Sequence, residues 1–172
     1  MKQQQKLKEA LDDYFDVCVA LQADLQDLLN TETASAAWRR NFVRVSMTVL
    51  EGHAQSFRRL CSVALECDSP ELTRKEVLLL RKERAFSVNE RLKLTLNVAY
   101  KLFELEPASG LDGHEYFAAL RLMKKRQEIL QPKVLRDLDL GEDTWVEVYE
   151  STKWLLGLFD GFSCALRESV GR

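Results

Sequence analysis

The feature that most constrains the fold is a regular spacing of apolar residues near the start of the chain. Seven side chains follow one another at intervals of alternately four and three residues: Leu7, Leu11, Tyr14, Cys18, Leu21, Leu25 and Leu28. On an α-helix this spacing places all of them on one side, where they pack against near-parallel neighbouring helices. The spacing predicts a long helix over about residues 3–29.

Residues that interrupt helices are scarce in the rest of the chain. The 172 residues include seven glycines and three prolines, most of which lie where the helical periodicity stops. Between those points the apolar spacing predicts further helices over about 34–65, 70–83, 88–105, 116–130 and 145–166. A chain of this length makes one ordinary domain. We therefore expect an all-α, single-domain bundle of about six helices over residues 1–172.

Polar residues and prolines predict where several of these helices begin and end. The run Asp-Ser-Pro-Glu at 68–71 combines a capping residue with a first-turn proline. Ser87 and Glu90 have the spacing of a capping box, in which each side chain accepts a hydrogen bond from the backbone amide of the other residue. Asp143 or Thr144 is expected to cap the last helix. Pro132 is expected to break the helix before it.

Charge and hydropathy exclude several classes of protein. The formal net charge is −2, which excludes a uniformly basic nucleic-acid binder. The longest apolar runs, 77–80 and 154–159, are far shorter than the ~20 residues that cross a bilayer, so no membrane span is expected. The N-terminal run is charged and amphipathic where a signal peptide would carry an apolar core. These features predict a cytoplasmic protein.

The cysteines and histidines do not have the spacing of a metal site. The four cysteines, Cys18, Cys61, Cys67 and Cys164, include no Cys-x2-Cys pair. Zinc sites use paired ligands at short spacing, so we expect no metal and no other cofactor. Buried single thiols are expected instead. His53 lies beside the apolar stripe of its helix and is expected to be a hydrogen-bonded core residue.

Charge is distributed unevenly along the expected helices. Residues 1–32 hold three lysines against seven acidic residues, and residues 121–136 hold six basic residues against a single acidic one. Such runs are usually solvated helix surfaces, and otherwise they steer a charged partner. The candidate binding residues are Asp12, Asp13 and Asp16 in the acidic run, and Arg121, Lys124 and Lys125 in the basic run.

A polar stripe follows the second expected helix. Arg40, Arg44 and Glu51 return to nearly the same angle around the helix axis, as do Gln55 and Arg58. Two interpretations stay open: the stripe is a solvated face, or Arg44 and Glu51 form a network that faces a groove between helices. Under the second interpretation Arg40, Arg44 and Glu51 are candidate binding residues.

A short motif at the end of the fifth expected helix resembles a known signature. The run from Arg126 to Pro132 looks like the Arg-x4-His-Pro motif of HEPN-type helical-bundle proteins, with Gln131 in the position of the histidine. The pattern Arg-Arg-x-Phe-Val-Arg at 39–44, followed by Glu-Gly at 51–52, is similar to the second helix of some bacterial members. Together the two matches span about residues 36–145.

This resemblance implies a compact helical bundle, often dimeric, in which arginine and histidine from paired subunits cut RNA without a metal. Glutamine does not exchange a proton near pH 7 as histidine does, so Gln131 cannot serve as the general acid or base. His114 is a poor substitute, because it lies about three helical turns before Arg126. We therefore expect Arg126, Gln131 and Pro132 to form a degenerate motif without catalytic activity.

The sequence as a whole predicts a non-enzymatic helical protein that binds another macromolecule. The leading hypothesis is an immunity protein or antitoxin that blocks a toxin such as a nuclease, because an acidic helix face can imitate a nucleic-acid backbone and attract a basic active site. The alternative is a HEPN-like metal-independent ribonuclease, or an RNA-binding component of a toxin system, that holds phosphates with Arg126 and its basic neighbours. A third hypothesis is a structural homodimer that associates through the first helix.

Overall fold

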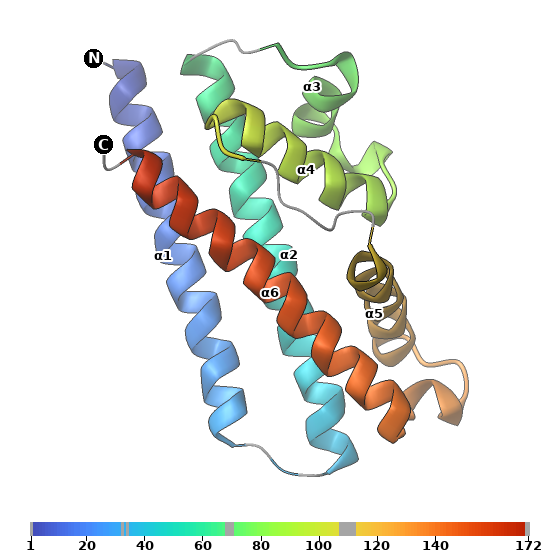
Figure 1. Cartoon of the computed structure of the whole chain (residues 1–172). Coiled ribbons are helices and arrows are strands. Elements are labelled where there is room, and N and C mark those ends of the chain that lie inside the picture. The colour runs from blue at the N-terminus through green and yellow to red at the C-terminus, as the bar shows by residue number, and fades with distance from the viewer. Residues whose placement is uncertain (1, 32, 34, 68–70, 107–112, 171–172) are drawn as a thin grey trace. The chain divides into compact units, whose positions relative to one another are not determined.

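The computed structural model describes residues 2–31, 33, 35–67, 71–106 and 113–170. Within these ranges all regular secondary structure is helical, and no strand is present (Figure 1). The expected all-α fold is confirmed. The described helices are α1 (Lys2–Asn30), α2 (Ala36–Cys67), α3 (Arg74–Arg81), η1 (Glu83–Ala85), α4 (Val88–Leu102), α5 (His114–Leu130), η2 (Leu135–Leu138) and α6 (Glu142–Val170), where η marks a short 3-10 helix.

The described residues form two compact units. Unit 1 takes those within Met1–Val19, Gly52–Ser109 and Gly161–Arg172, and unit 2 takes those within Ala20–Glu51 and Gly110–Asp160. Helices α1, α2 and α6 contribute residues to both units, whereas α3 and α4 belong to unit 1 and α5 belongs to unit 2. The single domain expected from the sequence stays a prediction.

Aromatic side chains fill the core of unit 1. Phe57 is fully buried, and its ring centroid lies 4.2 Å from that of Phe162 and 5.4 Å from that of Tyr14. The Tyr14 hydroxyl forms a hydrogen bond of 2.7 Å with Ser163 Oγ, so the polar end of this buried ring is satisfied. Burial raises the pKa of the Tyr14 hydroxyl.

The expected core histidine is confirmed, and two of the four cysteines are buried. His53 is fully buried, with its Nδ1 atom 3.1 Å from Cys18 Sγ. Cys18 and Cys61 are buried as expected, and burial raises the pKa of the Cys61 thiol. Cys67 is only half-buried and Cys164 is exposed. The expectation of buried thiols is wrong for these two, because they do not lie on the buried sides of α2 and α6.

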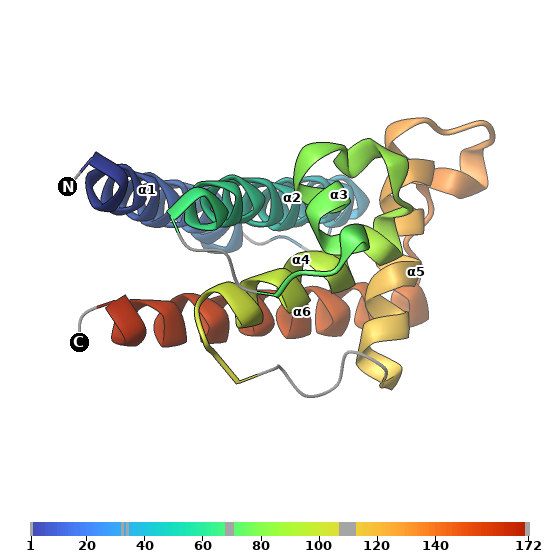
Figure 2. The ribbon, with the colours of Figure 1, turned by 90° about the horizontal axis from the view of Figure 1, so that it is seen from above.

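Helices α3 and α4 of unit 1 lie side by side (Figure 2). The predicted capping box at the start of α4 is confirmed: Ser87 Oγ accepts from the Glu90 amide at 3.3 Å, and the Glu90 carboxylate accepts from the Ser87 amide at 3.2 Å. The helix ends at Leu102 and not at the predicted Leu105. Glu104 has a φ of 52°, which is outside the range of a right-handed helix.

The predicted start of α3 near Pro70 is wrong. Thr73 and Glu76 form a second capping box, and the helix begins between them at Arg74. The reciprocal hydrogen bonds satisfy amides of the first turn and therefore set the start at this point. The predicted cap in the run 68–70 lies outside the described residues.

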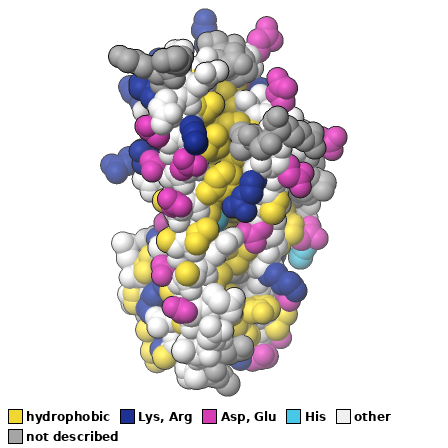
Figure 3. All heavy atoms as spheres, turned by 90° about the vertical axis from the view of Figure 1, so that its left-hand side faces the viewer, with side chains coloured by type: hydrophobic (Ala, Val, Ile, Leu, Met, Phe, Trp, Pro, Cys, Tyr) yellow, Lys and Arg dark blue, Asp and Glu magenta, His cyan; other side chains and the backbone are white. Residues whose placement is uncertain are grey.

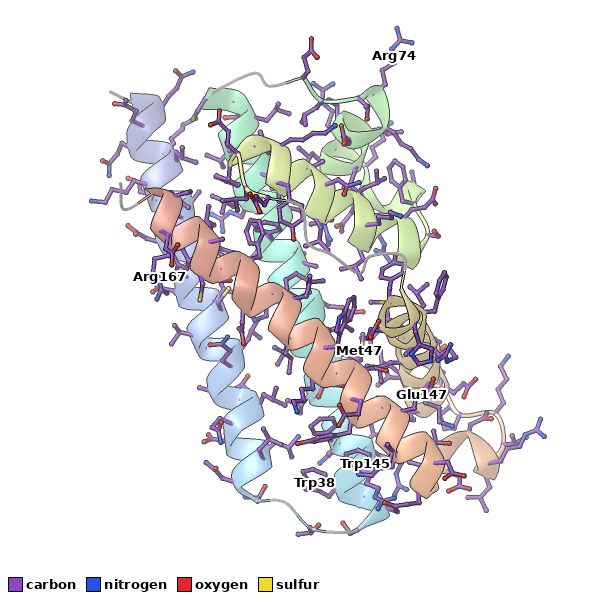
Figure 4. The ribbon with its side chains drawn as sticks, in the orientation of Figure 1. Trp38, Met47, Arg74, Trp145, Glu147 and Arg167 are labelled. Carbon is purple, nitrogen blue, oxygen red and sulfur yellow. The ribbon has the colours of Figure 1, made fainter. Side chains whose placement is uncertain are left out.

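A cluster of aromatic rings forms part of the core of unit 2. Trp38 and Phe42 of α2 contact Trp145 of α6 with ring centroids 5.6 and 5.2 Å apart, and Tyr149 extends the cluster. Figure 4 shows the two tryptophans close together. Arg39 lies over the Trp145 ring at 5.2 Å and donates to Glu142 at 2.6 Å. The cluster therefore joins the start of α2 to the start of α6.

The ends of α5 and α6 follow the prediction only in part. The predicted break before Pro132 is confirmed, since α5 ends at Leu130 with Gln131 as its C-cap. Helix α6 begins at Glu142, and the Trp145 amide donates to the Gly141 carbonyl at 2.8 Å. Asp143 and Thr144 therefore lie within the first turn, and the prediction that one of them caps the helix is wrong.

Candidate functional site

The two polar motifs found in the sequence meet within unit 2. Arg126 of α5 forms a double ion pair with Glu51 of α2, in which Nη1 and Nη2 each lie 3.0 Å from a carboxylate oxygen. Bidentate pairs of this kind are among the strong contacts between a guanidinium and a carboxylate. The Arg126 side chain is 25% exposed, and its Nε atom is buried without a hydrogen-bond partner in the described part of the chain. The pair ties α5 to α2.

The structure pairs Arg44 and Glu51, the two residues of the possible network on the polar stripe, with other residues. Arg44 is half-buried and donates to Asn41 Oδ1, at 3.3 Å on its own helix. Arg40 is also half-buried and donates to the Leu138 carbonyl at 3.4 Å. The polar stripe of α2 is thus neither a fully solvated face nor an Arg44–Glu51 network, because Arg44 bonds within its own helix, while Glu51 pairs with Arg126 of α5.

The basic residues around Arg126 also have carboxylate partners. Arg121 pairs with Glu147 of α6, and Lys125 pairs with Glu128 at 3.5 Å. The Lys124 side chain lies outside what the structure describes. A phosphate that bound Arg121, Lys125 or Arg126 would have to displace a carboxylate, which lowers the net gain from such a contact.

The remainder of the degenerate motif lies at the surface. Gln131 and Pro132 are exposed, and Gln131 Oε1 accepts a hydrogen bond of 2.8 Å from Gln127 Nε2. Both partners of this bond are amides. The motif therefore offers a guanidinium bound to a carboxylate and an amide bound to an amide, and Gln131 supplies no imidazole for general acid–base catalysis.

The acidic residues proposed from the sequence are exposed on α1. Asp12, Asp13 and Asp16 all face solvent, and Asp13 pairs with Arg59 at 3.0 Å. Among the described residues no basic side chain forms an ion pair with Asp12 or Asp16. On the side of the molecule that carries α1, Figure 3 shows acidic side chains beside exposed hydrophobic ones. We call Glu9, Asp12, Asp13 and Asp16 the acidic face of α1.

A groove that the sequence analysis missed lies between α5 and the first half of α6, within unit 2. It has a volume of about 760 Å³ and contains Val146, Trp154, Gly157 and Leu158 from α6, with His114 and Glu115 from α5. The available signal was a set of apolar residues on α6 outside its main core stripe. Such residues cannot be distinguished from core residues until the neighbouring helix is placed.

The described residues carry no sign of a metal centre or a membrane span. No group of three or more His, Cys, Asp or Glu side chains in the described ranges is arranged to hold a metal ion. None of the described helices combines the length and the apolar character needed to cross a bilayer.

Comparison with protein-family models, with curated proteins and with solved structures found no match for this chain. The HEPN-like assignment therefore rests on the short motifs alone and stays a prediction.

Proposed function

We propose that this chain is a cytoplasmic immunity protein or antitoxin that binds a basic toxin, such as a nuclease, and blocks it without catalysis. The observation that carries the proposal is the acidic face of α1. The chain has no lysine or arginine between Lys8 and Arg39. The rest of α1 beyond Lys8 therefore carries no basic side chain that could neutralise the acidic face.

The geometry of the acidic face fits a basic surface. Positions 9, 12, 13 and 16 fall within a sector of about 100° around a helix axis and extend over about 10 Å. Several carboxylates on one side of a helix can imitate the phosphates that a nuclease binds. Complementary charge of this kind accelerates association and selects the partner.

The degenerate motif supports a binding function over a catalytic one. Arg126 is engaged by Glu51, and Gln131 has no titrating group. In RNA cleavage without a metal, a general acid or base contributes about 10²- to 10⁴-fold to the rate. With glutamine in the position of the catalytic histidine, we favour a function that needs no proton transfer, namely binding to the active site of another protein.

Co-expression with the products of adjacent genes tests the proposal. We expect one of these products to arrest growth, and we expect the wild-type chain to restore it. The double variant Asp12→Lys/Asp16→Lys should lose rescue and bind the purified toxin about tenfold or more weakly, because it reverses two charges of the acidic face.

The matched control is Glu71→Lys/Glu106→Lys, which changes the net charge equally at exposed positions elsewhere and should retain rescue. The absence of a toxic neighbour, or equal rescue by both double variants, contradicts the proposal.

Cleavage of total RNA by the pure chain in the presence of a chelator, abolished by Arg126→Ala, would instead support the HEPN-like ribonuclease.

A further inference from the structure

The groove between α5 and α6 presents apolar surface to solvent. Val146 is 54% exposed, and Trp154 and Leu158 are half-buried. All three line the groove and recur on α6 at intervals of eight and four residues, so they lie on one side of the helix. An exposed apolar strip of this kind, bordered by polar residues, is typical of an interaction site.

The border of the groove is acidic. Four carboxylate side chains line it, against two basic ones; the acidic residues are Glu115, Asp143, Glu147 and Glu150, and the basic residues are Arg121 and Lys153. Arg121 and Glu147 pair with each other, which leaves three carboxylates and one cation of the lining to meet a ligand. Figure 4 shows Glu147 on the side of α6 that faces α5. The groove therefore combines an apolar base with an excess of negative charge.

Gly157 keeps the groove open at the end near Trp154 and Leu158. It lies inside a 29-residue helix, where glycine costs about 1 kcal/mol relative to alanine. A Cβ atom at this position would meet no atom within 4 Å, so the packing of unit 2 does not require glycine here. A larger side chain would project into the groove that Gly157 lines.

We propose that this groove binds a basic amphipathic helix of a partner protein. The lining of α6 extends from Asp143 to Leu158, which is about 22 Å along the axis and matches a helix of about 15 residues. The exposed apolar residues of α6, next to α5, can accept the apolar face of a partner helix. Lysine and arginine on the flanks of that partner helix would meet the acidic border.

The inference goes beyond the proposed function, because the groove uses α5 and α6 of unit 2 and not the acidic face of α1. The two surfaces can therefore be tested separately. A variant that impairs one of them should leave the other intact.

The probe is a fluorescein-labelled synthetic peptide of about 18 residues, with leucines spaced three and four apart and with lysines and arginines on the flanks. Fluorescence anisotropy measures its affinity for the full-length chain. One control peptide carries glutamate in place of the basic residues. A second control keeps the composition of the probe and scrambles the leucine spacing. We expect measurable binding of the basic amphipathic peptide alone.

The decisive variant is Gly157→Leu, which fills the groove. We expect it to weaken binding of the basic peptide about tenfold or more while the thermal midpoint stays the same or rises. Gly161→Leu is the matched control: it lies on the same helix, is exposed, and has no atom within 4 Å of an added Cβ, but it does not line the groove. It should bind the peptide like the wild-type chain.

Three results would overturn the inference. They are the absence of peptide binding, equal affinity of the scrambled peptide, and equal affinity of the Gly157→Leu and Gly161→Leu variants. The Asp12→Lys/Asp16→Lys variant should bind the peptide normally, so a failure of the inference is distinguishable from a failure of the proposed function.

Discussion

At the scale of single residues, buried or shielded charges in this protein are held by partners distant in the sequence. Glu76 is 4% exposed and accepts hydrogen bonds of 2.9 and 3.0 Å from Lys101 Nζ, in addition to the Thr73 amide. Burial alone would raise the pKa of Glu76, but the bonds from Lys101 and Thr73 outweigh it and leave the pKa below its ordinary value. Glu76 should therefore stabilise the fold only while it is ionised.

The pH dependence of stability tests this interpretation of Glu76. Because the folded-state pKa is lower than the unfolded-state value of about 4.3, the stabilisation is complete above that pH and is lost as the pH falls through the folded-state pKa. We expect Glu76→Gln to lower the free energy of unfolding by about 2 kcal/mol at pH 7. The loss should shrink as the pH falls below about 4.

Urea titrations at several pH values measure this effect. Glu168→Gln, an exposed position on α6, serves as the control and should have little effect at any pH. A penalty for Glu76→Gln that is the same at pH 3 and pH 7 would show that the charge does not stabilise the fold.

At the scale of elements, short capping motifs decide where the helices of unit 1 begin. Helices α3 and α4 start with the same pair of reciprocal hydrogen bonds, made by Thr73 with Glu76 and by Ser87 with Glu90. Hydrogen bonds to the Glu90 carboxylate, mainly from Lys75 and also from Ser87, lower the pKa of Glu90 to about 2. This residue therefore keeps its charge in mild acid. Only the second box was recognised in the sequence, because Pro70 offered a competing start for α3.

Removing a cap should destabilise the protein by a measurable amount. We expect Thr73→Ala and Ser87→Ala each to lower the free energy of unfolding by about 1 kcal/mol, since each leaves an amide of the first turn without its side-chain partner. Thr48→Ala is the matched control, because Thr48 is an exposed threonine inside α2 whose hydroxyl donates to the Arg44 carbonyl. This control should be neutral or slightly stabilising. Thermal denaturation of the three variants gives the comparison.

At the scale of the whole molecule, the two compact units share three helices. The three tryptophans of the chain, Trp38, Trp145 and Trp154, all belong to unit 2, whereas Phe57 belongs to the core of unit 1. Tryptophan fluorescence therefore reports on one unit, while a substitution of Phe57 acts on the other. Because α1, α2 and α6 continue through both units, and helix formation is cooperative along a segment, we expect the units to unfold together.

A core truncation tests this coupling. Phe57→Ala should lower the free energy of unfolding by about 3–5 kcal/mol and should shift the urea midpoint of tryptophan fluorescence as much as that of far-ultraviolet circular dichroism. Coincident curves identify a single cooperative domain. A fluorescence midpoint that does not move would show that the units unfold independently, contrary to the single domain expected from the sequence.

The sequence by itself determined the helical class, the capping box of α4, the break before Pro132 and the burial of His53. Each of these depends on neighbours within about four positions or on the periodicity of one helix. Only the tertiary structure decided that Glu51 binds Arg126, 75 residues away, and that Val146 and Gly157 line a groove. Such contacts depend on how distant helices pack, and local spacing does not specify which helix lies opposite.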